Sequence, residues 1–122
     1  MILGIGVDII KTSRFLHWKK DKKLGGRFFT KEELNYIYGR GELAHLSFAS
    51  HFAAKEAYGK ALGVGLRGMK LKDISVYFVA GRPMLRLENN AKAIFEDRGG
   101  KTVHLSLSHE KENAIAFVII EG

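Results

Sequence analysis

Apolar and polar positions alternate at the start of the chain and then change to a helical period. Over positions 2–10, the apolar residues Ile5, Val7 and Ile9 alternate with small or polar residues, which predicts a β-strand. The segment 43–62 carries the longest helical pattern of the sequence. Alanines recur there every four residues, at Ala49, Ala53, Ala57 and Ala61. This ridge of small side chains predicts a long helix that a neighbouring element can approach closely.

Shorter elements are marked by caps and turns. Thr30 and Glu33 have the spacing of a capping box, which predicts a helix from about residue 31 to 38. Asn89 is expected to cap another helix, ended by the glycine pair at 99–100. Strands are expected in a hairpin and in a later pair, at 74–80, 84–87, 102–108 and 114–120. The pattern predicts an α+β fold, with a mainly antiparallel sheet packed against a long helix in a single domain, 1–122.

Composition narrows the class of protein. The chain has 122 residues and no cysteine, which excludes a disulfide scaffold, a thiol nucleophile and a thiolate metal site. The first residues lack the basic region and cleavage site of a signal peptide. No apolar stretch approaches the roughly 20 residues that span a bilayer. We therefore expect a soluble, cytoplasmic protein without membrane insertion.

The basic residues gather in the segment 11–31, where Thr12 or Ser13 is expected to cap a short helix that ends before Gly25-Gly26. Apart from Asp21, its charged residues are all basic: Lys11, Arg14, Lys19, Lys20, Lys22, Lys23, Arg27 and Lys31. The rest of the chain is neutral, so the whole net charge of +7 lies here. Such a surface attracts nucleic acid, lipid headgroups or an acidic protein, unless it is only a solvated loop.

Asp8 lies near the end of the first predicted strand, among small residues. Gly4 and Gly6 have the spacing that begins a dinucleotide fingerprint, but Ile9 stands where the third glycine belongs. An acidic side chain at a strand end suits a hard cation such as Mg²⁺, which takes one or two carboxylates plus phosphate and water oxygens. The alternative is that Asp8 caps the helix that follows.

Glu56 and Lys60 lie four residues apart on the long helix and share one face. An exposed ion pair is the ordinary interpretation of this spacing. Gly63 and Gly65 follow at the helix end, however, and their free backbone N–H groups would join the carboxylate and the ammonium. That combination suits a metal-bound polyphosphate.

The predicted strand near the C-terminus places His104, Ser106 and Ser108 on one face, and His109 follows where the turn begins. A histidine at a strand end is either structural or catalytic. A serine hydrolase is disfavoured, since the sequence has no Gly-x-Ser-x-Gly elbow and no third member of a triad.

Three motifs in this order closely resemble the bacterial holo-acyl-carrier-protein synthases, which are short 4′-phosphopantetheinyl transferases. They are GIGVDI at 4–9, FAAKEA at 52–57 and HLSLSH at 104–109, and the resemblance extends over essentially the whole chain. It implies a homotrimer with active sites between adjacent subunits and a dependence on Mg²⁺. It also implies coenzyme A as donor, acyl carrier protein as acceptor and a role in fatty acid biosynthesis.

By the same resemblance, Asp8 and Glu56 match the metal carboxylates, Lys60 matches a phosphate-contacting lysine and His109 matches the histidine after the Ser-x-Ser strand. A serine hydroxyl of the apo carrier protein would attack the β-phosphate of coenzyme A and release 3′,5′-ADP. Glu56 is the candidate to accept the serine proton and Lys60 to stabilise the leaving phosphate. His109 is expected to be catalytic and to contact coenzyme A. Further coenzyme A contacts are expected from Lys60 and from the glycine loop, at Gly63 and Gly65.

One position departs from the family pattern. Ser50-His51 stands where the family usually has Gly-Arg, whose arginine contacts a coenzyme A phosphate. His51 is a partial replacement, because it offers fewer donors and is mostly neutral at pH 7.

The basic segment fits an acidic carrier protein, with Arg14 and Lys22 as expected contacts. The rival hypothesis is a nucleic-acid-binding module with Phe15 and Trp18 as stacking partners. It leaves Asp8 and Glu56 unexplained, so no nucleic acid partner is expected.

Overall fold

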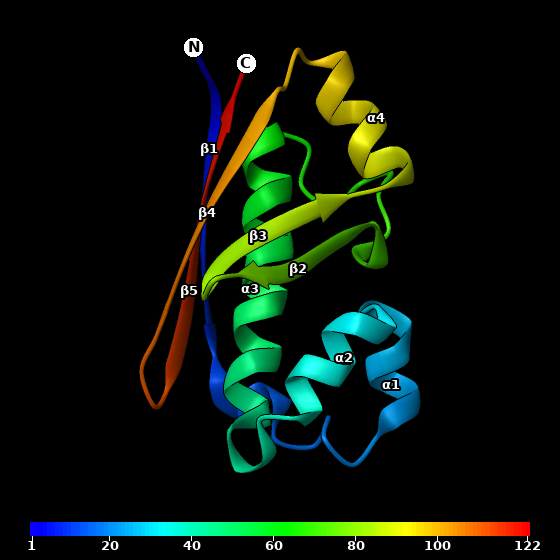
Figure 1. Ribbon diagram of the computed structural model, residues 1–122, viewed down its shortest axis with the longest axis vertical. Helices are drawn as coiled ribbons and strands as arrows, with labels where there is room; N and C mark the ends of the chain where they lie inside the picture. Colours follow the sequence, from blue (N-terminus) through cyan, green and yellow to red (C-terminus); the bar gives the residue numbers. More distant parts are fainter.

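A long helix lies between a three-stranded sheet and the other elements of the molecule (Figure 1). The computed structural model describes all residues, 1–122. The strands are β1 Ile2–Lys11, β2 Ile74–Val79, β3 Arg82–Leu87, β4 Thr102–His109 and β5 Asn113–Glu121. The α-helices are α1 Lys22–Phe28, α2 Lys31–Tyr38, α3 Ala44–Leu62 and α4 Asn89–Asp97. Short 3₁₀ helices occur at η1 Thr12–Phe15, η2 Gly41–Leu43 and η3 Leu71–Asp73.

All strand pairs are antiparallel. One sheet has the order β1-β5-β4, and the hairpin β2–β3 forms the second. Helix α3 packs on β1 and β5, while β3 reaches across to contact β4 (Figure 1). These elements confirm the predicted α+β fold, with antiparallel sheets and a long central helix.

Strand β1 lies directly on α3 because both surfaces are made of small residues. A Cβ atom added at Gly4 would lie 1.8 Å from the carbonyl oxygen of Ala61, and one at Gly6 would lie 1.9 Å from that of Ala57. The alanine ridge therefore meets the glycine face of the strand. The apolar face of the same strand points the other way, and Val7 is 53% exposed.

We expect Gly6→Ala to destabilise the protein by more than about 3 kcal/mol, because the added methyl group overlaps main-chain atoms of α3 that have no room to move. Urea unfolding followed by circular dichroism measures this loss. Gly26→Ala is the matched control, since nothing lies within 4 Å of a Cβ there and the helical position tolerates alanine. Equal stability of Gly6→Ala and the wild type would contradict the close packing.

The basic segment differs from its prediction. Thr12 and Ser13 lie inside η1 rather than capping it, and Lys11 at the cap position makes no side-chain hydrogen bond. Helix α1 then runs through the Gly25-Gly26 pair instead of ending before it. Asp21 caps this helix by accepting a hydrogen bond from the Leu24 N–H at 3.0 Å. The physical reason is packing: a Cβ at Gly25 would lie 3.2 Å from side-chain atoms of α2, so glycine permits the contact between the two helices.

The predicted cap of α4 is also wrong. Glu88 occupies the cap position without a side-chain hydrogen bond, and Asn89 is the first helical residue, with a φ of +49°. The Asn89 amide donates to Oδ1 of Asp73 at 2.9 Å. Its side chain therefore ties α4 to η3 instead of capping the helix.

The capping box at Thr30 and Glu33 is confirmed. The Thr30 hydroxyl accepts from the Glu33 N–H at 3.2 Å, and Glu33 Oε1 accepts from the Thr30 N–H at 3.0 Å. The carboxylate of Glu33 is buried, which gives it a second role described below.

Candidate active site

Asp8 and Lys60 meet where β1 crosses α3. Lys60 Nζ donates to Asp8 Oδ1 at 3.0 Å and to the carbonyl oxygen of Val7 at 3.0 Å. The Asp8 carboxylate is thus engaged with α3 and does not cap η1, which excludes the capping alternative. The close packing of Gly4 and Gly6 on the helix is what brings the strand and the lysine together.

Glu56 lies one helical turn before Lys60 and is half-buried. Burial raises the pKa of the Glu56 carboxyl, and the nearby charge of Asp8 raises it further, against the opposing effects of Lys60 and Arg14. Arg14 comes from η1, and its guanidinium lies 5.0 Å from the centre of the Phe52 ring. The structure therefore gathers two carboxylates and two cations at one place, as predicted for Asp8, Glu56 and Lys60.

The donor set decides which metal this centre can accept. No group of three or more His, Asp or Glu side chains is close enough to hold a metal by itself. After burial, the charge of Asp8 is the second cause of the raised pKa of Glu56, and a divalent cation held by both carboxylates would relieve that repulsion. Mg²⁺ suits such a site because it retains water and takes further oxygens from substrate phosphates, whereas structural zinc sites need four protein ligands.

The glycine loop follows directly at the end of α3. Gly63 has a φ of +81° and ends the helix in a left-handed cap, and Gly65 has a φ of +63°. The Gly63 N–H donates to the carbonyl oxygen of Lys60 at 3.0 Å and the Gly65 N–H to that of Gly59 at 3.0 Å, so the loop folds back along the helix. The prediction that these two N–H groups are free is therefore wrong. Arg98 anchors the helix end from the other side, because its guanidinium donates to the carbonyl oxygen of Leu62.

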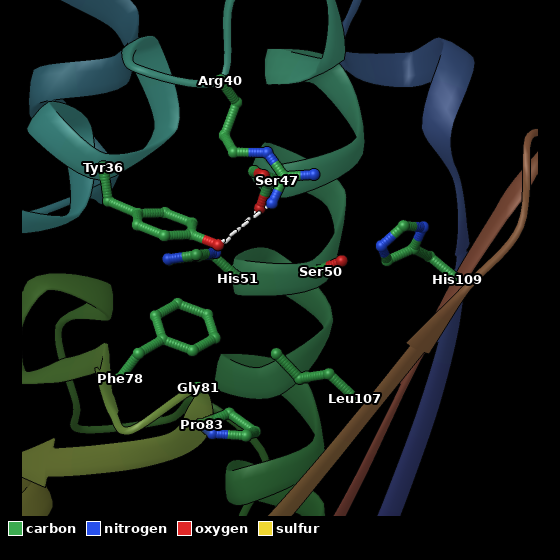
Figure 2. A pocket seen from close by; sticks show the side chains of 10 residues that line it. All are labelled: Tyr36, Arg40, Ser47, Ser50, His51, Phe78, Gly81, Pro83, Leu107 and His109. Carbon is green, nitrogen blue, oxygen red and sulfur yellow. Dashed lines mark hydrogen bonds between the residues drawn. The ribbon is translucent and has the colours of Figure 1, made fainter.

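His51 and His109 lie together in a different place. Both line a cavity of about 250 Å³ between α2, α3, the hairpin and β4 (Figure 2). Its lining is completed by Tyr36, Arg40, Ser47, Ser50, Phe78, Gly81, Pro83 and Leu107. Asp8, Glu56 and Lys60 are not among these residues.

Helix α3 separates the two groups within one chain. Asp8 pairs with Ala116 of β5, and His109 pairs with Ala114 of the same strand. Both alanines are buried and face α3, which lies across the sheet at this point. Asp8 therefore lies on the β1 side of the helix and His109 on the β4 side. The structure brings the predicted residues into two groups rather than one.

His51 is almost completely buried, with 1% of its surface exposed. Nδ1 lies 2.8 Å from the carbonyl oxygen of Ser47, and the ring lies 5.7 Å from that of Tyr36. Burial lowers the pKa of His51 to about 3, with a further contribution from the charge of Lys55. The imidazole is thus neutral at pH 7 and offers no charge to a phosphate.

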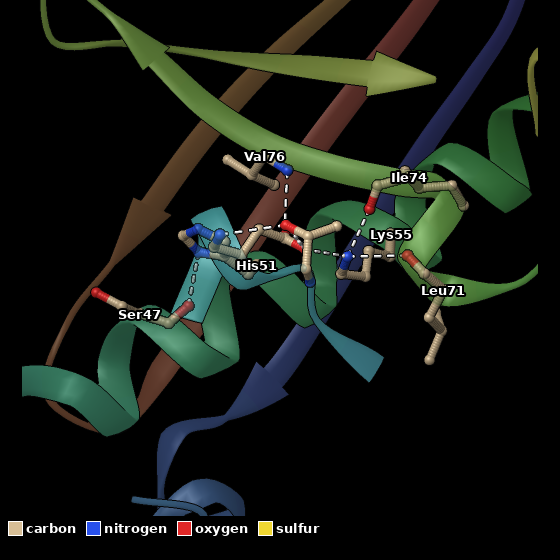
Figure 3. A network of polar contacts seen from close by, with 8 residues as sticks. Ser47, His51, Lys55, Leu71, Ile74 and Val76 are labelled. Carbon is tan, nitrogen blue, oxygen red and sulfur yellow. Dashed lines mark hydrogen bonds and ion pairs between the residues drawn. The ribbon is translucent and has the colours of Figure 1, made fainter. Parts of the chain in front are cut away.

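Glu33 and Lys55 form a buried ion pair that the sequence analysis missed. Lys55 Nζ donates to Glu33 Oε1 at 2.8 Å, and the Val76 N–H donates to Glu33 Oε2 at 3.1 Å. Figure 3 shows the same ammonium group donating to the backbone carbonyls of Leu71 and Ile74. Burial lowers the pKa of Lys55, and Glu33 opposes that shift. The pair joins α2, α3 and β2, and so fixes the rotation of α3, which carries His51 and Glu56 on either side of Lys55.

The rival nucleic-acid hypothesis needs Phe15 and Trp18 as stacking partners. Phe15 is fully buried, and its ring lies 4.9 Å from that of Trp18. Trp18 is partly buried and also packs against Phe28, Phe29 and Phe48. Phe15 is therefore not free to stack on a base.

The outer face of the three-stranded sheet is apolar and uncovered. Val7 pairs with Phe117, and Ile9 pairs with Ile115. Between 38% and 61% of the surface of each of these side chains is exposed. No helix of the chain is both long enough and apolar enough to cross a membrane.

The fold and the carboxylate–lysine centre define a class of phosphopantetheine-transferring enzymes. The family model described as the 4′-phosphopantetheinyl transferase superfamily matches residues 4–118, and the chain belongs to this superfamily. Within it, the chain is 54% identical over 123 residues to the holo-[acyl-carrier-protein] synthase of Treponema denticola, with both chains covered completely.

Solved structures agree with the sequence relatives. The holo-[acyl-carrier-protein] synthase of Neisseria meningitidis superimposes with a TM-score of 0.89 at 35% identity, with both chains covered completely. The enzyme of Bacillus anthracis, solved in complex with CoA (3′,5′-ADP), gives a TM-score of 0.81 at 38% identity. It is matched over 100% of this chain and 98% of its own.

Proposed function

We propose that Asp8, Glu56 and Lys60 form the catalytic centre of a holo-[acyl-carrier-protein] synthase reaction. The chain transfers the 4′-phosphopantetheine group from coenzyme A to a serine of apo acyl carrier protein, as the activity of its relatives and a relative's complex with coenzyme A support. The observation that carries the residue assignment is the contact of Lys60 with Asp8 beside the half-buried Glu56. The reaction belongs to fatty acid biosynthesis, and we place it in the cytoplasm.

Asp8 and Glu56 would hold Mg²⁺, which, when bound, neutralises charge on the pyrophosphate of coenzyme A. The side chain of Lys60 is 53% exposed, so it can leave Asp8 and bind phosphate oxygens. The serine oxygen forms a bond to the β-phosphorus as the bond from that phosphorus to the 3′,5′-ADP oxygen breaks. Lys60 stabilises the negative charge on the departing phosphate.

Glu56 accepts the proton of the attacking serine. Its carboxylate is half-buried beside Asp8 and Lys60, within the centre where the serine would attack.

A homotrimer would complete the site. His51 and His109 lie across α3 from Asp8 and Glu56, so one chain presents two half-sites. Active sites between adjacent subunits would join the half-site of one copy to the complementary half-site of the next. The uncovered apolar sheet face around Phe117 supplies a surface that such an assembly buries.

The direct test of this function is incubation with coenzyme A and an apo carrier protein, with Mg²⁺ or with a chelator. Mass spectrometry should find the carrier increased by the mass of phosphopantetheine only when Mg²⁺ is present. An unmodified carrier with Mg²⁺ would overturn the reaction, and equal modification in the chelator would overturn the metal assignment.

Carrier recognition is assigned to the basic segment. Arg14 lies beside Glu56, and Lys22 is exposed at the start of α1. We expect the double variant Arg14→Glu with Lys22→Glu to raise KM for the carrier protein about 10-fold and to leave KM for coenzyme A nearly unchanged. Wild-type kcat/KM for the carrier should fall as salt screens the exposed charges, and the double variant should lose much of that dependence.

The matched control reverses two exposed lysines elsewhere, Lys92 and Lys101, and should leave the carrier KM within about 2-fold of wild type. If the Arg14 and Lys22 reversal changes neither the carrier KM nor its salt dependence, the segment is only a solvated basic surface.

A further inference from the structure

Arg40 places an unpaired cation on the cavity that His51 and His109 line. Its only side-chain hydrogen bond runs from Nη1 to the Tyr36 hydroxyl oxygen at 3.2 Å (Figure 2). None of the four ion pairs of the chain includes Arg40. A guanidinium without a carboxylate, on the wall of a cavity, is the side chain best suited to bind a phosphate or carboxylate ligand.

His51 has the opposite polarity. The carbonyl oxygen of Ser47 can only accept a hydrogen bond, so the Nδ1 that lies 2.8 Å from it carries the ring proton. Because the low pKa keeps the ring neutral, Nε2 holds a lone pair and can only accept. This Nε2 atom is buried without any partner. The ring of His51 therefore offers neither a charge nor a free donor to a phosphate in the cavity.

The other residues of the cavity supply an acceptor and an aromatic wall but no second cation. The Ser50 hydroxyl already donates to the carbonyl oxygen of Leu46 at 3.0 Å, so its remaining capacity is as an acceptor. The rings of Tyr36 and Phe78 stack with their centres 4.6 Å apart and form an aromatic wall. The cavity volume of about 250 Å³ is below the roughly 300–1,000 Å³ of sites that enclose a whole small ligand, so it receives only one part of a larger molecule.

We propose that Arg40, and not His51, binds the 3′-phosphate of coenzyme A in this protein. This inference rests on the proposed function, which supplies the ligand. Arg40 would thus supply the positive charge that an arginine at position 51 supplies in the family pattern. The two residues are far apart in the sequence, but α2 and α3 bring both onto the same cavity.

The test compares coenzyme A with 3′-dephospho-coenzyme A as donors for the wild type and for Arg40→Met. We expect kcat/KM with coenzyme A to fall about 10- to 100-fold in the variant, mainly through KM, because a charge-assisted hydrogen bond is lost. With the dephospho donor, kcat/KM should change less than about 3-fold. The preference of the wild type for coenzyme A should therefore disappear.

Two further variants keep the result interpretable. Arg86→Met removes an exposed arginine that stacks on Tyr77, outside the cavity, and should leave both donors unaffected. His51→Gln should keep the ratio of kcat/KM for the two donors within about 3-fold of wild type, because the neutral, buried ring supplies no charge to the 3′-phosphate. The inference is overturned if Arg40→Met keeps the preference for coenzyme A, or if His51→Gln abolishes it. Absence of transfer by the wild type would instead overturn the proposed function.

Discussion

Replacing Glu56 by glutamine, or Asp8 by asparagine, is expected to lower the rate of phosphopantetheine transfer by more than about 100-fold without unfolding the protein. Loss of a residue that merely supports a metal ligand costs about 10- to 100-fold, so loss of one of only two carboxylates should exceed this range. Both substitutions keep the size of the side chain. The measurement is kcat/KM at limiting and at saturating Mg²⁺, together with the thermal unfolding midpoint.

Stability should survive both changes. Burial and Asp8 raise the pKa of Glu56, so its ionised form is less favourable in the folded chain than in the unfolded chain at neutral pH, and glutamine removes that cost. Asp8→Asn loses an ion pair whose lysine is half exposed, which contributes about 0–1 kcal/mol. Glu96→Gln in α4 is the control for an exposed glutamate. Normal turnover of either site variant at limiting Mg²⁺ would contradict the metal assignment.

Replacing Phe117 by aspartate should break the proposed homotrimer and abolish transfer with it. Phe117 is exposed on the outer sheet face, opposite Val7 and Ser106, and a carboxylate there would be buried without a partner in an assembled interface. Light scattering should give the mass of one chain, and activity should fall more than about 100-fold, because each chain alone holds only half of the site.

Leu43→Asp is the matched control for this change, since Leu43 is exposed to a similar extent but lies in η2, away from the sheet. It should remain a trimer with wild-type activity. A Phe117→Asp protein that is monomeric and fully active would show that one chain suffices for catalysis.

Much of the fold could be predicted because its signals are local. The capping box at Thr30 needs only four consecutive residues, and the alanine ridge of α3 needs only its own spacing. The passage of α1 through Gly25 could not be predicted in this way, because contact with α2 outweighs the poor helix propensity of glycine. The role of Asn89 could not be predicted locally either, because its side chain hydrogen-bonds to Asp73, which is distant in the sequence, instead of capping the helix.

Some residues of the candidate site could be predicted from local spacing, and others could not. The spacing of Glu56 and Lys60 places them on one helix face, and Asp8 joins them from the neighbouring strand β1, where it bonds to Lys60. Arg40 carries no such signal, because only the packing of α2 on α3 places it near His51. The alternation of β1 likewise does not say which face is covered, and here the glycine face meets the helix while the apolar face is left exposed.

The central claim is that two half-sites, one around Asp8 and one around His109, form a single active site between neighbouring copies. It is tested most directly by co-expressing Asp8→Asn and His109→Ala chains with different tags, purifying the mixed oligomers and measuring transfer. Each variant alone should be nearly inactive. Purified mixed trimers should regain about one third of wild-type activity, because each has one site in three that combines an unaltered Asp8 from one copy with an unaltered His109 from the next. Mixed oligomers that stay as inactive as the separate variants would contradict the shared site.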